Sequence, residues 1–420
     1  MRIGMFCLPW TGHLNPFAGL AHELIRRGHE PVFFHLPDFA EPVRRRGFRF
    51  ESYGEREWPA GSLAERYRAM SRLAGLRASQ AGLDILRSQA EVLFRDGPAV
   101  IEKAGLDFWV VDQMDYAAST LAAVMRAPFA TLIVTLMRNH EDGVPGFSGE
   151  PYSDDPAVQE RDRRFNEAFL ATGQPFRDYI GAHRVNHGLG PFRFETLWSN
   201  LAQITQQPSA FEFPRKQLPP CFHFTGPFAL GGGRPPAPFP WERLSAKPLI
   251  YASLGTTQNR NSHLYEAIAR ASPKLDAQIV LSLGGMDPDE LPLTTAGNLL
   301  VVPFAPQLEI LERAVLMITH AGMNSALECL AAGVPMVAVP IAHDQPGVAA
   351  RIEWTGTGVR VPPAQCDAAR LGAAIEVVLS QPGFRQAAQR FRKTIRQIDG
   401  PACAARIIEQ AMETRRPVLR

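Results

Sequence analysis

The sequence predicts an α/β fold made of two domains, each built on a mostly parallel sheet. The chain has 420 residues, whereas a single core rarely grows beyond roughly 250 to 300 residues. In both halves, short apolar runs alternate with longer segments of helical period, which is the pattern of β-α-β units. Between the halves, residues 231–238 are rich in glycine and proline, which is typical of an exposed linker.

The first half opens with a clear β-α-β unit. Asn15 is placed to cap a helix whose first residue is Pro16, and Gly28 ends it. Asp115 should cap a second, Ala-rich helix that runs to residue 126. Residues 140–165 show no clear periodicity, and we interpret them as a long loop or short helices. The expected strands lie at residues 3–8, 31–36 and 108–111.

The second half repeats this alternation. We expect helices at residues 262–271 and 307–313. The expected strands lie at residues 249–254, 278–283, 299–302, 315–319 and 336–340.

These patterns divide the chain into three parts. They predict a first domain at residues 1–228, a linker at 229–246 and a second domain at 247–420, whose last helix could pack back on the first domain. In two such domains, ligands bind where the carboxyl ends of the parallel strands meet.

Composition excludes several classes of protein. Acidic and basic residues nearly balance, at a net charge of +2, so no strong field favours nucleic acid as a partner. The five cysteines are scattered without metal-ligand spacing, which favours a reducing compartment and no structural zinc. No apolar stretch reaches the ~20 residues that span a bilayer. We therefore expect a cytoplasmic protein.

The most informative segment is His320-Ala-Gly-Met-Asn-Ser-Ala-Leu-Glu328, which follows an expected strand and opens a helix. A helix N-terminus of this kind favours anions through its unpaired N–H groups and its dipole. Glu328 lies one turn after Asn324 and could accept two hydrogen bonds from a ribose diol. Taken alone, Asn324 and Ser325 are more typical of a helix cap, and His320 of a buried histidine near a strand end.

The segment, continued by Asp344-Gln345 after another strand, resembles the nucleotide-sugar signature of the family-1 UDP-glycosyltransferases. That resemblance implies the GT-B fold, with two Rossmann-like domains, and extends over nearly the whole chain. It implies that the donor diphosphate binds to residues near the helix start, and that Glu328 binds the ribose. The diphosphate ligands would be His320, Gly322, Asn324 and Ser325.

The same resemblance assigns the rest of the donor site. Asp344 and Gln345 would hold hydroxyls of the transferred sugar, and Thr256, after the first strand of the second half, would contact phosphate. Phe304, Ala305 and Gln307 belong to a segment similar to the family's uracil-binding one. Plant members usually have Trp at the positions of Phe304 and Met323, so the chain is more similar to bacterial members, and the choice between uracil and thymine stays open.

The reactive residues are expected in the first half. His13 follows the first strand, where a neutral imidazole could accept a hydroxyl proton. Asp112 follows another strand at the same edge and could fix the tautomer of the histidine. By residue type alone, His13 could be a turn residue and Asp112 a helix cap. The family resemblance favours a catalytic base assisted by a carboxylate.

The resemblance implies an inverting hexosyltransferase that moves glucose from UDP-glucose to a hydroxyl of an apolar small molecule. Within the family, the sequence looks most like zeaxanthin and macrolide glucosyltransferases. This suggests a carotenoid, macrolide or polyphenol-like acceptor. If the acceptor is a lipid, we expect peripheral contact with a membrane. No Asp-x-Asp metal motif is present at the diphosphate segment, so we expect no metal and no cofactor.

Two alternatives stay open: a nucleotide-sugar epimerase or hydrolase of the same fold, and a non-catalytic nucleotide-sugar-binding protein. His13 and Asp112 argue against the second.

Overall fold

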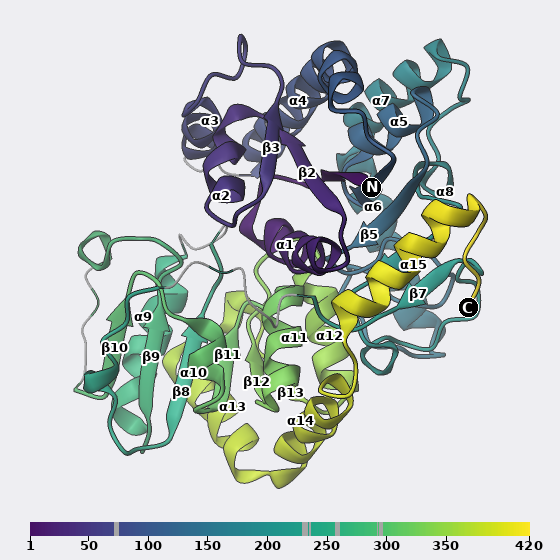
Figure 1. Cartoon of the computed structure of the whole chain (residues 1–420). Coiled ribbons are helices and arrows are strands. Elements are labelled where there is room, and N and C mark those ends of the chain that lie inside the picture. Colours follow the sequence, from purple (N-terminus) through teal and green to yellow (C-terminus); the bar gives the residue numbers. More distant parts are fainter. Residues whose placement is uncertain (71–74, 229–233, 235–236, 257–260, 292, 294–296) are drawn as a thin grey trace.

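The computed structural model contains two parallel sheets, one in each half of the chain (Figure 1). It describes residues 1–70, 75–228, 234, 237–256, 261–291, 293 and 297–420. The first sheet has the strand order β3-β2-β1-β4-β5-β6-β7, and the second has the order β10-β9-β8-β11-β12-β13. Every neighbouring pair is parallel, as the alternation of strands and helices predicted.

The first half supplies seven strands and eight of the described helices. The strands are β1 (Arg2–Phe6), β2 (Glu30–His35), β3 (Arg49–Ser52), β4 (Phe108–Asp112), β5 (Phe129–Ile133), β6 (Gln203–Thr205) and β7 (Phe222–Phe224). The helices are α1 (Thr11–Arg26), α2 (Ala40–Arg44), α3 (Ser62–Met70), α4 (Gly75–Ala104), α5 (Tyr116–Val124), α6 (Pro156–Thr172), α7 (Gln174–Asn186) and α8 (Phe194–Leu197).

The second half supplies the remaining elements. The strands are β8 (Leu249–Ser253), β9 (Gln278–Ser282), β10 (Leu299–Val302), β11 (Ala314–Thr319), β12 (Met336–Ala338) and β13 (Gly358–Arg360). The helices are α9 (Ser262–Ala271), α10 (Gln307–Leu311), α11 (Met323–Ala332), α12 (Gln345–Trp354), α13 (Ala368–Ser380), α14 (Pro382–Ile395) and α15 (Gly400–Thr414).

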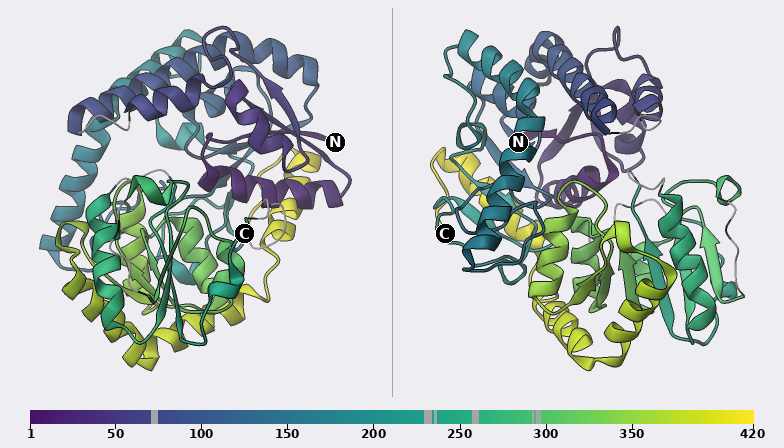
Figure 2. Two further views of the ribbon diagram at one scale, coloured as in Figure 1. Left: turned by 90° about the vertical axis from the view of Figure 1, so that its left-hand side faces the viewer. Right: turned by 180° about the vertical axis from the view of Figure 1, so that it is seen from behind.

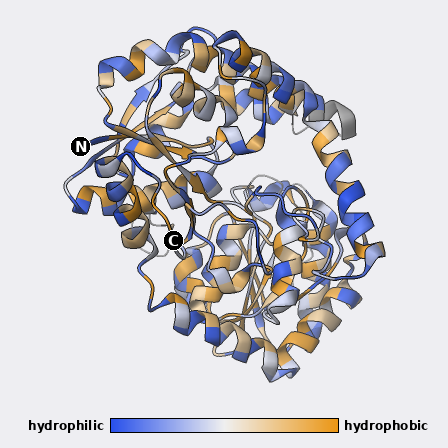
Figure 3. Cartoon of the chain, turned by 90° about the vertical axis from the view of Figure 1, so that its right-hand side faces the viewer, coloured by the Kyte–Doolittle hydropathy of each residue, from blue (hydrophilic) through white to orange (hydrophobic). Residues whose placement is uncertain are grey.

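Helices cover both faces of each sheet, and successive side chains of a strand point alternately into the two cores. In β4, Val110 packs in the cluster that contains α1, whereas Trp109 and Val111 pack in the cluster that contains α4 and α5. In β8, Tyr251 faces α11 and α12, and Ala252 faces α9 and α13. The hydropathy colouring shows the same layering, with hydrophobic strands inside each half (Figure 3).

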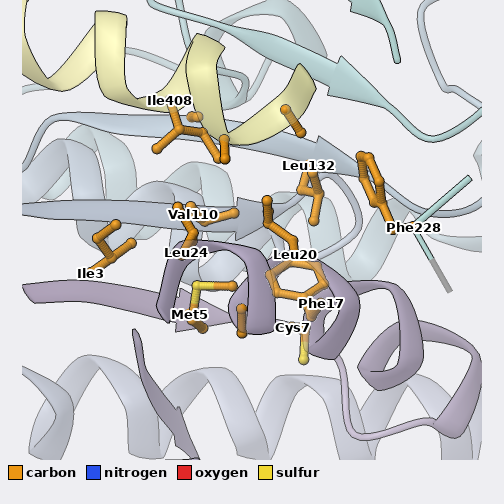
Figure 4. Packing of buried hydrophobic residues seen from close by; sticks show 14 of the residues in the cluster. Ile3, Met5, Cys7, Phe17, Leu20, Leu24, Val110, Leu132, Phe228 and Ile408 are labelled. Carbon is orange, nitrogen blue, oxygen red and sulfur yellow. The ribbon is translucent and has the colours of Figure 1, made fainter. Parts of the chain in front are cut away.

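The last helix, α15, crosses from the second half and packs on the first sheet. Ile408 lies over Val110 and Leu132 on the face that also holds Leu20 and Leu24 of α1 (Figure 4). Burying an Ile or Leu side chain stabilises the folded state by roughly 1.5 to 3 kcal/mol, so this contact ties the end of the chain firmly to the first half.

Some expectations at the level of elements were wrong. Helix α1 begins at Thr11 after Trp10, so Asn15 and Pro16 lie inside it rather than at its start. Pro16 is the sixth residue of the helix and has no N–H to donate to the Gly12 carbonyl four residues earlier. That carbonyl instead accepts a hydrogen bond from Asn324 Nδ2 at 2.5 Å. Asp115 does cap α5, accepting a hydrogen bond from the Ala118 N–H at 2.9 Å.

Residues 140–165, expected to be a loop or short helices, instead lead into the 17-residue helix α6. This helix begins with an Asp155 cap and Pro156 at its first position. It reaches toward the second half, where Phe169 packs against the core that contains Phe147 and Leu136 (Figure 2).

The border between the halves is less simple than the predicted ranges. Phe211, within the range predicted for the first domain, is fully buried in the core of the second half. Within the predicted linker, Phe239, Trp241 and Leu244 pack against that same core. Residues 229–233 and 235–236 of the linker lie outside the described residues.

Candidate active site

The candidate residues gather where the strand order of each sheet reverses direction along the chain. In the first sheet this point lies between β1 and β4, and in the second between β8 and β11. Parallel sheets bind ligands at such points because the following loops leave in opposite directions and open a crevice. His13 and Asp112 lie at the first point, and Thr256 and His320 lie at the second.

His13 and Asp112 form a buried pair. The His13 Nδ1 atom lies 2.5 Å from the Asp112 Oδ2 atom. Their side chains are 8% and 1% exposed, so water competes little for this contact. Because a carboxylate only accepts hydrogen bonds, it holds the proton on Nδ1 and leaves Nε2 as the proton-accepting nitrogen. His13 lies in the first turn of α1, not in a turn before the helix as predicted.

The other oxygen of Asp112 is also held. Its Oδ1 accepts a hydrogen bond from the Met114 N–H at 2.9 Å, which fixes the carboxylate plane. Nearby, burial raises the pKa of Asp115 to about 7, although the α5 N–H groups oppose this shift and the Asp112 charge adds to it. Trp10 lies edge-on to the His13 ring, with 5.4 Å between ring centroids.

The start of α11 has the features expected of an anion site. Gly322 occupies the N-cap position and no side chain caps the helix, so its first N–H groups are open. Ala321 has a φ of 62°, a left-handed conformation that a non-glycine residue rarely adopts. Ser325 is half-buried in the first turn.

His320 fits between two glycines. A Cβ atom on Gly255 would come within 2.8 Å of the His320 Nε2 atom, and one on Gly322 within 2.5 Å. Burial lowers the pKa of His320 to about 4, so the imidazole is neutral near pH 7 and can offer an N–H, not a positive charge. Thr256, directly after Gly255, is exposed.

Glu328 is buried in the same helix, and its carboxylate is already bonded. Gln307 donates from Nε2 to the Glu328 Oε2 atom at 2.7 Å and lies 3.4 Å from the Ser325 Oγ atom. Arg234 makes a two-pronged contact with both carboxylate oxygens, one of them at 3.2 Å. The structure therefore brings Glu328, Gln307 and Ser325 together, and adds Arg234 on the carboxylate expected to bind ribose.

Phe304 presents an exposed ring beside this group. It is 53% exposed, and a Cβ atom on Gly285 would come within 2.7 Å of its ring. An aromatic face held open in this way can stack on a planar base. Ala305, next to it, packs against the core of the second half.

Asp344 and Gln345 lie at the start of α12. Asp344 accepts a hydrogen bond at Oδ2 from the Leu136 N–H of the first half, at 2.9 Å. Gln345 accepts at Oε1 from the N–H groups of Ile341 and Ala342, at 2.7 and 2.9 Å. These contacts leave Asp344 Oδ1 and the Gln345 amide nitrogen as the groups that can meet a ligand.

Asn324, which the family resemblance assigns to the diphosphate, bonds to the first half through both atoms of its amide. Its Nδ2 atom donates to the Gly12 carbonyl at 2.5 Å, and its Oδ1 atom accepts from Gln206 Nε2 at 2.7 Å. The side chain therefore joins α11 to α1, which carries His13.

The described residues contain neither a cluster of metal ligands nor a helix that could span a membrane. Across residues 1–70, 75–228, 234, 237–256, 261–291, 293 and 297–420, no three His, Cys, Asp or Glu side chains are grouped as a metal site. In the same part of the chain, none of the helices has the length and hydropathy needed to cross a bilayer.

The chain is similar in sequence and in fold to several known proteins. Residues 193–397 match the family model described as UDP-glucoronosyl and UDP-glucosyl transferase. Over almost its full length the chain is 31% identical to the zeaxanthin glucosyltransferase of Pantoea ananas, covering 98% of this chain and 96% of the relative. It is 30% identical to the zeaxanthin glucosyltransferase of Pseudescherichia vulneris, covering 96% of each.

The chain belongs to this UDP-glycosyltransferase family. It is a glycosyltransferase, as the sequence predicted, and not a non-catalytic binding protein. The fold agrees: the glycosyltransferase of kitacinnamycin superposes with a TM-score of 0.73 at 24% identity, covering 97% of this chain and 98% of the other. The calicheamicin glycosyltransferase superposes with a TM-score of 0.72 at 24% identity, covering 99% of both chains. The two Rossmann-like domains form the GT-B architecture.

Arg234 and Gln206 contact site residues of this glycosyltransferase, although the sequence predicted no role for either. Gln206 carried a usable signal, because Thr205-Gln206-Gln207 places polar residues directly at the carboxyl end of β6. Arg234 carried none, because an arginine within a Gly/Pro-rich linker is ordinarily solvated.

Proposed function

We propose that this glycosyltransferase moves glucose from UDP-glucose to a hydroxyl of an apolar small molecule, with inversion at the anomeric carbon. The observation that carries the proposal is the buried His13–Asp112 pair at the switch point of the first sheet. The two zeaxanthin glucosyltransferases, at 31% and 30% identity, support glucose as the sugar and a carotenoid alcohol as the first acceptor to test.

In the proposed reaction, His13 Nε2 takes the proton of the acceptor hydroxyl as its oxygen attacks the anomeric carbon. The bond from that carbon to the diphosphate breaks on the opposite face, so an α-linked sugar becomes β-linked. Asp112 keeps the imidazole in the required tautomer and stabilises the imidazolium that forms. Negative charge grows on the departing UDP.

In this proposal, the open N–H groups of α11 and the Ser325 and Thr256 hydroxyls would stabilise that charge. His320, which is neutral, has one N–H, for which the Ser253 carbonyl competes with the diphosphate. We extend the proposal to a reaction without a divalent ion, because these donors supply the stabilisation. Turnover should then persist in EDTA; a loss restored by Mg²⁺ or Mn²⁺ would contradict this part.

The test incubates the purified protein with UDP-glucose and zeaxanthin, with macrolide and flavonoid alcohols as alternative acceptors. Mass spectrometry should show a gain of one hexose on an acceptor, and NMR coupling at the anomeric proton should show a β-linkage. An α-linked product would contradict inversion. A new free sugar formed without acceptor would instead indicate an epimerase or hydrolase.

A further inference from the structure

Two amide side chains join the donor half of the protein to the helix that carries the proposed base. Asn324, at the start of α11, donates from Nδ2 to the Gly12 carbonyl at 2.5 Å. Gly12 directly precedes His13 in the first turn of α1. The contact thus joins the two switch points across 312 residues of sequence.

Gln206 fixes the direction of the Asn324 amide. Gln206 is 1% exposed, and its Nε2 atom donates to both the Val134 carbonyl and Asn324 Oδ1, each at 2.7 Å. An amide nitrogen has two hydrogens, so these bonds use both of its donors. Because Oδ1 of Asn324 must face Gln206, Nδ2 must face Gly12.

This arrangement has a consequence for the diphosphate. The Asn324 side chain spends its oxygen and one N–H on the first half, whereas the backbone N–H groups of α11 and the Ser325 hydroxyl stay open toward a ligand. Most of the anion contact can therefore be made without this side chain.

We propose that Asn324 and Gln206 form an interdomain latch that holds His13 at a fixed position relative to the bound donor. Gln206 acts as a positioning residue through Asn324, and Asn324 contributes to turnover more than to nucleotide affinity. The proposal rests on the proposed function, in which His13 is the base. A displacement of about 1 Å between reacting groups can cost up to 100-fold in rate, so a small slip between α1 and α11 is enough to matter.

The experiment compares four variants: Asn324→Ala, Gln206→Met, their combination, and Ser325→Ala. Gln203→Met is the matched control, because Gln203 is another buried amide, three residues earlier in β6, but bonds Asn139 and Ser199 within the first half. The measurements are kcat, the UDP dissociation constant by calorimetry, and hydrogen exchange of the peptide that contains residues 11–14.

For the latch, Asn324→Ala and Gln206→Met should each lower kcat by about 10- to 100-fold, with UDP affinity changed less than about threefold. The combined variant should be no slower than Asn324→Ala, because Gln206 acts only through Asn324. Ser325→Ala should weaken UDP, and Gln203→Met should keep wild-type kcat.

Equal weakening of UDP by Asn324→Ala and Ser325→Ala, with Gln206→Met silent, would overturn the latch and make Asn324 a diphosphate ligand. If the wild type transfers no sugar, the proposed function fails, but exchange still decides the latch. Faster exchange at residues 11–14 in Asn324→Ala and Gln206→Met, and not in Gln203→Met, supports it, and unchanged exchange in both refutes it. If Gln206→Met does not fold, Asn324→Ala alone gives the same decision.

Discussion

Side chains at the donor site can use some polar atoms within the protein and keep others for a ligand. Gln345 illustrates this division: its oxygen holds the loop at residues 341–342, and its amide nitrogen is left over. His320 differs, because burial keeps its imidazole neutral and the two neighbouring glycines leave room for its ring. Substitutions that keep one function and remove the other can therefore separate structure from binding.

Gln345→Glu should separate them most cleanly. The carboxylate can still accept from the Ile341 and Ala342 N–H groups, but it has no N–H for a sugar hydroxyl. The added negative charge should weaken both nucleotides to the same extent, and UDP-glucose should lose about 1 kcal/mol more than UDP, for one lost hydrogen bond. Gln345→Ala should weaken both, because the loop also loses its acceptor. Calorimetric titration with both nucleotides checks this, and an equal loss of UDP affinity in Gln345→Glu would refute the sugar contact.

His320 should make the protein less stable in acid. The unfolded histidine has a pKa near 6.5, whereas the folded one is at about 4, so between these values the unfolded state binds more protons. The free energy of unfolding is not reduced by His320 above pH 6.5. It decreases as the pH falls from 6.5 toward 4, by up to ~1.4 kcal/mol per pH unit. Urea unfolding of His320→Gln should show a shallower dependence over this window. The same slope in variant and wild type would assign the acid sensitivity to other groups, such as buried His35.

At the scale of elements, the expected strands correspond to β1, β2, β4, β8, β9, β10, β11 and β12, because apolar periodicity is a local property. The sequence analysis gave no bounds for β3, β5, β6, β7 and β13, nor for helices such as α3, α4, α7, α13 and α14. The start of α1 was misplaced because Asn15-Pro16 is a good local helix start, yet Trp10 and Thr11 continue the helix one turn earlier. Helix α6 was missed because its polar surface offers a weak periodic signal. The contacts of Arg234 and Gln206 depend on segments distant in sequence, which local patterns do not report.

The Arg234 contact on α11 gives a prediction of its own. Both oxygens of Glu328 are bonded to Arg234, so a ribose diol must displace at least one of these bonds. Arg234→Met should therefore bind UDP more tightly than the wild type, provided Gln307 still orients the carboxylate. Glu328→Ala should weaken UDP and UDP-glucose to a similar extent. Weaker UDP binding by Arg234→Met would mean that the guanidinium contacts the nucleotide instead of competing with it.

At the scale of the whole molecule, a buried ion pair fastens the two halves on the side of α12. Arg351 bonds Glu212 from its Nε atom at 3.1 Å and also contacts it through Nη2. It donates to the Gly347 and Pro145 carbonyls and lies over the Phe213 ring. Burial alone would raise the pKa of Glu212, but Arg351 holds it below its usual value. The sequence predicted two domains and the chemistry at each sheet edge, but this fastening joins residues 139 positions apart and left no local pattern.

Arg351→Met should lower the free energy of unfolding by about 3 kcal/mol, because it leaves the Glu212 carboxylate buried with a poorer set of partners. Adding Glu212→Gln should recover part of the loss, since the uncompensated charge is then removed. Urea unfolding of both variants checks this. A loss below about 1 kcal/mol for Arg351→Met would show that Arg215 and Gln207 compensate the carboxylate unaided.

The central claim, that His13 and Asp112 act as one proton-transfer unit, is tested most directly by a double-mutant cycle on kcat. His13→Ala should lower kcat by roughly 10²- to 10⁴-fold with UDP affinity nearly unchanged. Asp112→Asn should also lower kcat, and combining the two should cost little beyond His13→Ala. A phenolic acceptor, already acidic, should lose less than an aliphatic alcohol. Additive losses, or equal losses for both acceptors, would contradict the account and leave His13 as a structural residue of α1.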